Sequence, residues 1–511
     1  MKRMNNLVNK TFSWFFQRRY SYVEKYLNDP HKVQASELNN LLQSAKHTAY
    51  GKRYHFASIK DYNHFSERLP VCDYEDLKPF IRRMMLGERD VLWPGVIEWY
   101  SKSSGTTSEK SKYIPVTPKN LKHCHIKGGW DSMTLLYRQH PDLKIFGSKN
   151  LVMGGSIEPY VENPRSKIGD VSAIMLDHLP FYTRPFYTPD FETALSPNME
   201  EKINKMADIV PQHDVTMIGG VPTWVVVLFR KVLERTGKDN VLEVWPNLRV
   251  YMHGGVSFKP YIEQFKQFIP REDFIYQEIY NASEGFFAAQ DVPGQDGMAL
   301  FLNNGMYFEF IPAGEWDKER PTPIPLEAVE AGKNYAIVIS TNSGLWRYVP
   351  GDTVMFTSVN PYRIKVTGRT KHFINAFGEE VMVENTDAAL AATCRETGAI
   401  ATEYTVCPVY FSGSAKGGHQ WLIEFEKEPG NLESFSIILD NHLKKLNSDY
   451  EAKRYKNMAL ERLQIQVLPQ GTFYEWLRSK GKFGGQNKIP RLSNHRDYVE
   501  EILRFREQER I

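Results

Sequence analysis

The sequence predicts an α/β protein of two domains, a large one with mixed sheets and helices and a smaller α+β one. Short apolar runs that end in glycine pairs alternate with amphipathic segments through the middle of the chain, as is typical of strands followed by turns and helices. At 511 residues the chain is longer than one hydrophobic core usually serves. The texture changes after Arg369, so we expect domains over residues 1–369 and 370–511.

Composition excludes several classes of protein. With 64 basic and 61 acidic residues the net charge is +3, too balanced for a nucleic-acid-binding surface over the whole molecule. The four cysteines lie far apart without a CxxC pair, which disfavours a disulfide framework and favours the reducing cytoplasm. No apolar run is long enough for a membrane span, so we expect no integral membrane contact.

Residues 1–95 are expected to form a helical lead-in, because Leu38, Leu41, Leu42 and Ala45 recur at helical spacing. In the first twenty residues basic side chains surround large apolar ones. Such a segment fits either an interfacial amphipathic helix or a first helix that docks on the core, and the second interpretation is favoured.

Strands are expected over residues 96–100, 149–155, 215–220, 248–255 and 274–280, and Pro222 suits the first turn of a helix over residues 224–233. Residues 300–366 read as antiparallel or mixed strands. Beyond them we expect helices over 385–393 and 431–447 and a strand over 421–425. In such folds ligands gather at the loops that follow the strand ends, so the site is expected there.

The first candidate motif is Ser103-Ser104-Gly105-Thr106-Thr107, followed by Lys110 and Lys112. Hydroxyls beside a glycine offer donors to a phosphate, and a lysine supplies charge. An ordinary Ser/Thr turn explains the same residues.

The second motif is Tyr280-Asn281-Ala282-Ser283-Glu284-Gly285. The carboxylate suits Mg²⁺ held against nucleotide phosphates, and the tyrosine ring suits stacking on a base. A helix that begins at Ser283, with Glu284 in its first turn, is the alternative.

The third motif spans residues 344–354 and contains Asp352. An aspartate in a turn between strands suits two neighbouring ribose hydroxyls, although a β-turn aspartate is equally common. Arg369 follows seventeen residues later, as a ligand contact, a hinge neighbour or part of a surface salt bridge.

The fourth motif is the glycine-rich loop of residues 480–491, which carries Lys488. A lysine there suits charge that develops on a carboxylate or phosphate, whereas composition alone favours a solvated basic loop.

In this order and spacing, the four segments resemble the acyl-adenylate-forming superfamily, and specifically the acyl acid amido synthetases of the auxin-responsive promoter family, as a bacterial-type member. Residues 103–107 match the family's SSGTT motif, residues 283–285 its SEG motif, and residues 345–352 its LYRYxxGD motif with Trp346 in place of the first tyrosine. The resemblance implies a large N-terminal adenylate-forming domain and a smaller, mobile C-terminal domain.

The resemblance also implies roles for single residues. Lys488, Ser104 and Thr107 would be catalytic and Glu284 would hold Mg²⁺. ATP would contact Ser103, Ser104, Gly105, Thr106, Thr107, Lys112, Gly254, Gly255, Tyr280, Ser283, Asp352 and Arg369. The expected reaction activates a carboxylic acid with ATP and Mg²⁺ and transfers the acyl group to an amine, an amino acid by resemblance. Transfer to coenzyme A and a nucleotide-binding regulatory module without turnover stay open as alternatives.

Overall fold

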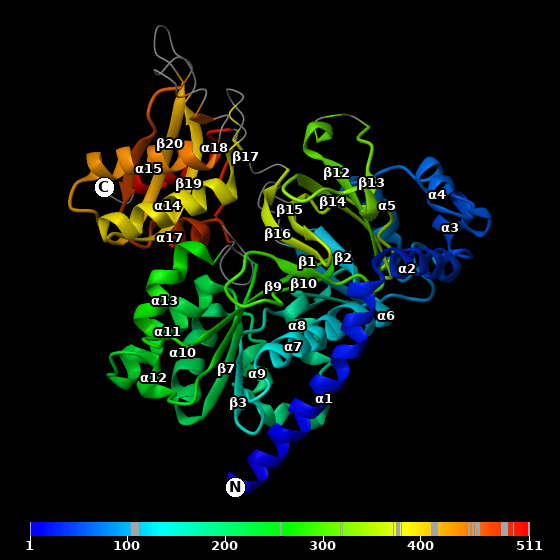
Figure 1. Cartoon of the computed structure of the whole chain (residues 1–511), viewed down its shortest axis with the longest axis horizontal. Helices are drawn as coiled ribbons and strands as arrows, with labels where there is room; N and C mark the ends of the chain where they lie inside the picture. The colour runs from blue at the N-terminus through cyan, green and yellow to red at the C-terminus, as the bar shows by residue number, and fades with distance from the viewer. Residues whose placement is uncertain are drawn as a thin grey trace. The chain divides into compact units, whose positions relative to one another are not determined.

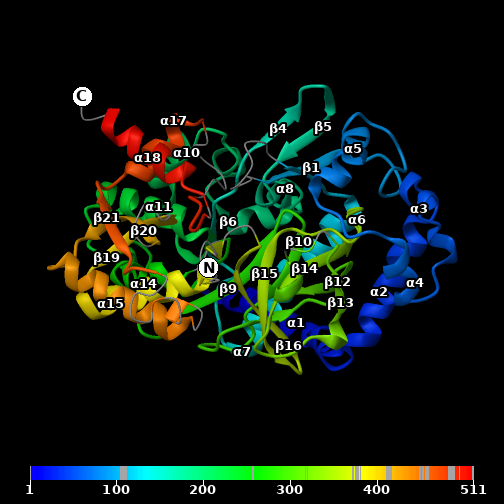
Figure 2. The same ribbon diagram turned by 90° about the horizontal axis from the view of Figure 1, so that it is seen from above.

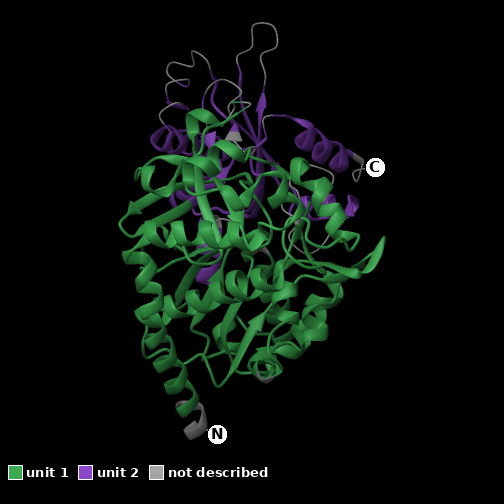
Figure 3. Cartoon of the chain, turned by 90° about the vertical axis from the view of Figure 1, so that its right-hand side faces the viewer, with its two compact units in different colours: residues 1–104, 110–256, 268–365 green, residues 105–109, 257–267, 366–511 purple. Residues whose placement is uncertain are grey.

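The computed structural model describes residues 2–103, 112–255, 258–316, 318, 320–370, 373–374, 379, 381–409, 417–447, 450–451, 454, 460–481, 489–493 and 495–508. The chain divides into two compact units, which Figure 3 colours separately. The larger unit contains residues 1–104, 110–256 and 268–365, and the smaller unit contains residues 105–109, 257–267 and 366–511. No helix among the described residues is long and apolar enough to cross a membrane.

The larger unit begins with a helical lead-in, as the apolar spacing predicts. Its helices are α1 (Lys2–Asn28), α2 (Pro30–Ala45), α3 (Ala49–Arg53), α4 (Tyr62–Arg68) and α5 (Tyr74–Met85). The caps explain where they begin: Asp61 accepts from the backbone N–H of His64, and Asp73 forms a reciprocal capping box with Asp76. Leu38, Leu41, Leu42 and Ala45 are buried, so the predicted apolar face is confirmed.

A twelve-stranded sheet organises the larger unit (Figures 1 and 2), in the order β13-β12-β14-β15-β16-β11-β10-β9-β8-β7-β3-β6. Its strands are β3 (Lys149–Val152), β6 (Tyr187–Thr188), β7 (Val215–Gly220), β8 (Val250–His253), β9 (Ile275–Ala282), β10 (Gly285–Ala289), β11 (Met298–Leu300), β12 (Met306–Pro312), β13 (Ile324–Pro325), β14 (Asn334–Thr341), β15 (Asp352–Val359) and β16 (Tyr362–Arg369). The strands from β9 to β6 run parallel, whereas β9, β10 and β11 pair antiparallel. β9 therefore lies where the sheet changes from parallel to antiparallel.

Helices connect the parallel strands. α8 (Val171–Asp177), α9 (Phe191–Ala194) and α10 (Met199–Ile209) precede β7, and α11 (Pro222–Thr236) and α12 (Val241–Val244) follow it. Pro222 lies in the first turn of α11, as predicted, since a missing N–H costs nothing there. Val215 and Ile218 of β7 and Leu228 of α11 are fully buried, as befits strands covered by helices.

A second sheet in the larger unit has the order β2-β1-β5-β4, with β1 (Trp99–Ser103), β2 (Lys112–Pro115), β5 (Asn163–Gly169) and β4 (Ile157–Tyr160). The strand expected over residues 96–100 was placed too early. Its pairing begins at Trp99, opposite Lys167 of β5, and continues to Ser103, opposite Lys112 of β2. After β2 the chain forms α6 (Pro118–Asn120), a π-helical turn η2 (Leu121–Ile126) and α7 (Lys127–Gln139).

The smaller unit has its own sheet, in the order β19-β20-β21, with β19 (Ile400–Val409), β20 (Gly418–Lys427) and β21 (Gln464–Leu468). Its helices include α13 (Ile262–Phe268), α14 (Val383–Thr397), α15 (Leu432–Leu446), α17 (Thr472–Ser479) and α18 (Asp497–Gln508), and β17 (Phe373–Ile374) pairs with β18 (Val381–Met382). α14 and β20 contain the helix expected over 385–393 and the strand expected over 421–425, and α15 lies within the helix expected over 431–447. Trp421, Leu439 and Leu443 are fully buried in its core.

Candidate active site

The strand that leads to the SSGTT motif is tied to the SEG motif by a buried hydrogen bond. Ser101 in β1 donates from Oγ to Oγ of Ser283, 3.0 Å away, in the turn between β9 and β10. Both residues are at most 4% exposed, so the bond is shielded from water. The ends of two different sheets therefore meet at this turn.

A second hydrogen bond joins the SEG segment to the third motif. The Tyr280 hydroxyl donates to Oδ2 of Asp352 at 2.5 Å, and Asp352 opens β15. The Tyr280 ring stacks on Phe287 with ring centroids 4.5 Å apart. Two of the four predicted motifs, and the strand that leads to a third, are thus connected within the larger unit by two hydrogen bonds.

Glu284 lies in the same turn with 6% of its surface exposed. Among the residues that the structure describes, no cluster of three or more His, Cys, Asp or Glu could hold a metal ion alone. A single protein carboxylate nevertheless fits Mg²⁺, which keeps several waters and binds substrate phosphates through its other positions. The geometry therefore fits a metal that arrives with a nucleotide and does not fit a resident all-protein metal site.

Glycine pairs follow three adjacent parallel strands. Val152 of β3 lies opposite Gly219 of β7, and Gly220 lies opposite His253 of β8. The Gly254–Gly255 pair follows β8, and a Cβ at Gly254 would lie 2.3 Å from the backbone oxygen of Ile279. Only glycine fits there, because the chain passes so close to the neighbouring strand. The three pairs lie at the carboxyl ends of neighbouring parallel strands, the edge at which such folds bind ligands.

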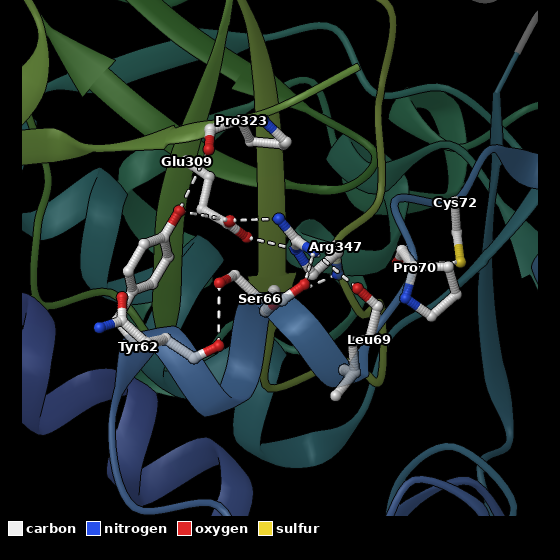
Figure 4. A network of polar contacts seen from close by, with 10 residues as sticks. Tyr62, Ser66, Leu69, Pro70, Cys72, Glu309, Pro323 and Arg347 are labelled. Carbon is white, nitrogen blue, oxygen red and sulfur yellow. Dashed lines mark hydrogen bonds and ion pairs between the residues drawn. The ribbon is translucent and has the colours of Figure 1, made fainter. Parts of the chain in front are cut away.

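The LWRYVPGD motif serves two purposes. Leu345, Trp346 and Tyr348 are fully buried, whereas Asp352 reaches Tyr280. The Arg347 guanidinium binds both carboxylate oxygens of Glu309, at 2.7 and 3.0 Å, and donates to two carbonyls of the lead-in, those of Ser66 and Leu69 (Figure 4). The first half of this motif therefore supports the site without reaching it.

The remaining predicted residues are placed in part. Lys112 lies opposite Ser103 in the β1–β2 pair, and its ammonium lies 5.8 Å from the centre of the Tyr74 ring. Arg369 ends β16 and belongs to the smaller unit. Ser104, Gly105, Thr106, Thr107 and Lys488, with the side chain of Ser103, lie outside the described residues.

Models of three protein domains match this chain. The GH3 family N-terminal domain matches residues 19–153 and 163–274, the GH3 family central domain matches residues 299–369, and the GH3 family C-terminal domain matches residues 384–497. Together they cover most of the 511 residues. The chain belongs to the GH3 family.

Curated relatives align with this GH3 chain over nearly their whole length. An indole-3-acetic acid-amido synthetase of Arabidopsis thaliana, GH3.4, is 23% identical, over 95% of this chain and 93% of its own. A 4-substituted benzoates-glutamate ligase of the same plant, GH3.12, is 23% identical over 95% of both chains. A jasmonoyl–L-amino acid synthetase of Nicotiana attenuata, JAR4, is 23% identical over 93% of this chain and 92% of its own. They are amido synthetases, so the predicted enzyme class is confirmed, but as plant proteins they give no support to a bacterial type.

Solved structures confirm the predicted fold class. The GH3.15 acyl acid amido synthetase has a TM-score of 0.77 at 16% identity and covers 95% of both chains. A 2-hydroxyisobutyryl-CoA ligase in its postadenylation state has a TM-score of 0.57 at 12% identity, over 93% of this chain and 91% of that one. The GH3 chain therefore has the fold of adenylate-forming enzymes.

Sequence reasoning missed a buried lysine that supports one glycine pair of this GH3 chain. Lys202 of α10, 1% exposed, donates from Nζ to the carbonyls of Gly154 and Gly155, at 2.7 and 3.0 Å. Asp170 accepts from the backbone N–H of Ser156 at 2.9 Å. Burial lowers the pKa of Lys202 to about 8 despite the opposing effect of Asp170, and burial raises the pKa of Asp170. An apolar helix face predicts no such role for a lysine, so only the structure reveals it.

Sequence reasoning also missed a buried histidine beside the SEG segment. Nδ1 of His125, in the π-helical turn η2, lies 3.2 Å from Oδ1 of Asn281, whereas its Nε2 is buried without a hydrogen-bond partner among the described residues. Burial lowers the pKa of His125 to about 4, so the ring is neutral at neutral pH. π-Turns often occur at functional sites, but no sequence pattern marks this one.

Proposed function

We propose that this GH3 enzyme activates a carboxylic acid with ATP as an acyl-adenylate and then transfers the acyl group to the amine of an amino acid. The observation that carries the proposal is that the strand leading to SSGTT and the aspartate of the third motif both meet the SEG segment, through the Ser101–Ser283 and Tyr280–Asp352 hydrogen bonds. Names of relatives that include indole-3-acetic acid-amido synthetase and benzoates-glutamate ligase support both halves of the reaction.

In the first half-reaction, an oxygen of the substrate carboxylate attacks the α-phosphorus of ATP. The bond from this phosphorus to the bridging oxygen breaks, and pyrophosphate leaves. Asp352, oriented by Tyr280, accepts hydrogen bonds from the ribose hydroxyls, and the ring of Tyr280 lies against the adenine. The backbone at Gly254 and Gly255 lies alongside the nucleotide, where a side chain would block the approach.

Charge on the phosphates is neutralised by residues from several segments. Ser103, Ser104, Gly105, Thr106 and Thr107 donate to the phosphates, Lys112 and Lys488 supply positive charge, and Ser283 and Arg369 complete the nucleotide contacts. Glu284 would hold Mg²⁺, which supplies charge stabilisation to the departing pyrophosphate. A single buried carboxylate in the turn supports this assignment.

In the second half-reaction, the neutral amine attacks the acyl carbon, the carbon–oxygen bond to AMP breaks, and the amide and AMP are released. The amine must lose a proton, and water or AMP can take it. The two compact units support the proposed division into domains over residues 1–369 and 370–511. By resemblance, the smaller domain turns between the two half-reactions. The cytoplasmic location and the absence of nucleic-acid partners stay predictions.

A second candidate function is transfer of the acyl group to coenzyme A, because a 2-hydroxyisobutyryl-CoA ligase has a similar fold. The two functions are distinguished by incubating the protein with ATP, Mg²⁺, a panel of acids and either amino acids or coenzyme A. Mass spectrometry then identifies the product. We expect an amide and AMP. A thioester formed only in the presence of the thiol would favour the ligase.

Exchange of labelled pyrophosphate into ATP tests the first half-reaction and the role of Asp352. Asp352→Asn keeps the shape but removes the charge, and we expect kcat/KM for ATP to fall about 10- to 100-fold, as for the loss of one or two charge-assisted hydrogen bonds. Asp239→Asn changes an exposed aspartate of the same unit and is the matched control. ATP binding without acid-dependent exchange would instead indicate a regulatory module.

A further inference from the structure

One face of helix α1 carries large apolar side chains into solvent. Leu7, Trp14 and Tyr22 are 67%, 60% and 68% exposed. At about 100° per residue they lie within about 80° of arc, so they form one stripe along the helix. Phe15 of α1 and Trp130 of α7 border it, 39% and 37% exposed, with ring centroids 5.6 Å apart. Exposed aromatic groups gathered in this way mark an interaction surface, because scattered single residues would not line up.

The opposite face of α1 anchors the helix to the larger unit. Phe16 is fully buried and stacks on Tyr137 of α7 at 5.1 Å, and Val23 is fully buried as well. The Arg19 guanidinium binds Asp131 at 2.5 Å, and Asn9 accepts from the backbone N–H of Phe146. Figure 1 shows α1 running along the edge of this unit. The stripe is therefore held in place by a packed helix and does not belong to a loose end.

The stripe is also basic. Arg18 and Lys25 lie between its apolar residues, and Lys10 lies beside them. The side chains of these three have no ion pair with any residue that the structure describes, although the Arg18 guanidinium lies 5.4 Å from the centre of the Trp14 ring. Glu24 is the single acidic residue of the helix and lies about 100° of arc away from Leu7.

We infer that this face of α1 lies on an anionic phospholipid surface. Aromatic and leucine side chains at the level of the headgroups, with lysine and arginine beside them, are the pattern of helices that lie in a bilayer interface. Leu7 to Lys25 spans about 27 Å of straight helix, which a flat surface contacts along its whole length. A second copy of this chain would bring two stripes of the same positive charge together, and such a contact is repulsive.

Co-sedimentation of the full chain with vesicles tests the inference. We expect binding to vesicles of phosphatidylcholine with phosphatidylserine, little binding to phosphatidylcholine alone, and weaker binding as the salt concentration rises. Replacing Lys10, Arg18 and Lys25 with Gln should weaken binding about fivefold per residue. Replacing Leu7, Trp14 and Tyr22 with Ser should weaken it at least about tenfold.

Matched controls distinguish the effect of the stripe on vesicle binding from the effects of net charge and of total exposed apolar surface. Lys52, Lys60 and Lys238 are exposed elsewhere on the larger unit, and replacing them with Gln changes the charge equally. Val161→Ser removes an apolar residue that is 92% exposed outside α1. Thermal unfolding checks that each variant is folded. The inference is overturned if the chain does not bind anionic vesicles at low salt, if the controls weaken binding as much as the stripe variants do, or if sedimentation velocity shows that the stripe joins two copies of the chain or a protein partner instead.

Discussion

His125 is a buried base that the folded chain keeps neutral. Its pKa lies at about 4, against an ordinary value of 6.5, because burial disfavours the charged ring and the hydrogen bond to Asn281 compensates in part. Between these two pH values the imidazole is therefore protonated in the unfolded chain and neutral in the native state. The free energy of unfolding therefore falls as the pH drops from 6.5 toward 4, and this group accounts for about 3 kcal/mol of the decrease.

We expect His125→Gln to flatten the dependence of unfolding free energy on pH between 6.5 and 4 by about one proton, since glutamine does not titrate there. The measurement is denaturant unfolding of the full chain over this range. His47→Gln is the control, because His47 is exposed in the same unit. Equal slopes in wild type and the His125 variant would show that this imidazole is charged in the fold.

Side chains show where prediction from the sequence ends. The motifs were found because their residue types and order are distinctive, and the structure brings Tyr280 to Asp352. Ser101 and Lys202 carry no such signal. A serine two residues before a motif and a lysine on a helix look ordinary until the fold buries them beside a distant turn. Their contacts join residues 182 and about 47 positions apart.

Among the elements, a buried ion pair is one of the connections between the lead-in and the large sheet. Arg347, with a φ of 42°, and Glu309 of β12 are 4% and 1% exposed, and the Tyr62 hydroxyl of α4 also donates to this carboxylate (Figure 4). The backbone continues the connection, since Cys72 donates to the carbonyl of Arg347 and accepts from the N–H of Val349. Three residues later the chain reaches Asp352.

We expect Arg347→Ala to lower the free energy of unfolding by about 3–5 kcal/mol, because Glu309 would be left buried without its cation. Arg165→Ala, at an exposed arginine of β5, should change it by less than about 0.5 kcal/mol. Denaturant unfolding followed by circular dichroism measures both. A stable Arg347→Ala chain would show that this ion pair does not hold the lead-in.

Elements with strong local patterns were predicted well, and those set by distant pairing were not. The helix over 385–393 and the strand over 421–425 lie inside α14 and β20, since apolar periodicity alone specifies them. The strand near residue 96 was placed three residues early, because Val96 and Ile97 look more strand-like than the polar end of β1. The pairing of β1 with β2 and β5 decides where β1 begins and ends, and this pairing cannot be predicted from the local sequence.

On the scale of the whole molecule, each unit has a core of its own. Among the residues that the structure describes, the main core of the larger unit contains none beyond Ile364, and the cores of the smaller unit contain none before Ile374. Composition and length predicted two domains but not that residues 257–267 would group with the smaller one. Contacts between segments distant in sequence decide such grouping.

We therefore expect a chain that ends at residue 369 to fold, with a cooperative melting transition, and to bind ATP, because the core and three motifs remain. Acid-dependent pyrophosphate exchange should fall about 100- to 1,000-fold, since one charge-stabilising group, Lys488, is missing. Full-length Lys488→Ala should reproduce this loss. A fragment without cooperative melting would show that the smaller unit is needed to fold the larger one.

The hydrogen bond from Ser101 to Ser283 has a consequence for reading related genomes. A chain can keep SSGTT, SEG and the aspartate intact and still lose this buried hydrogen bond between two sheets, through one substitution at a position that no signature includes. Searches that count signatures alone would label such a gene product as active. Such searches should also ask whether a residue with a hydroxyl group stands two positions before the first signature.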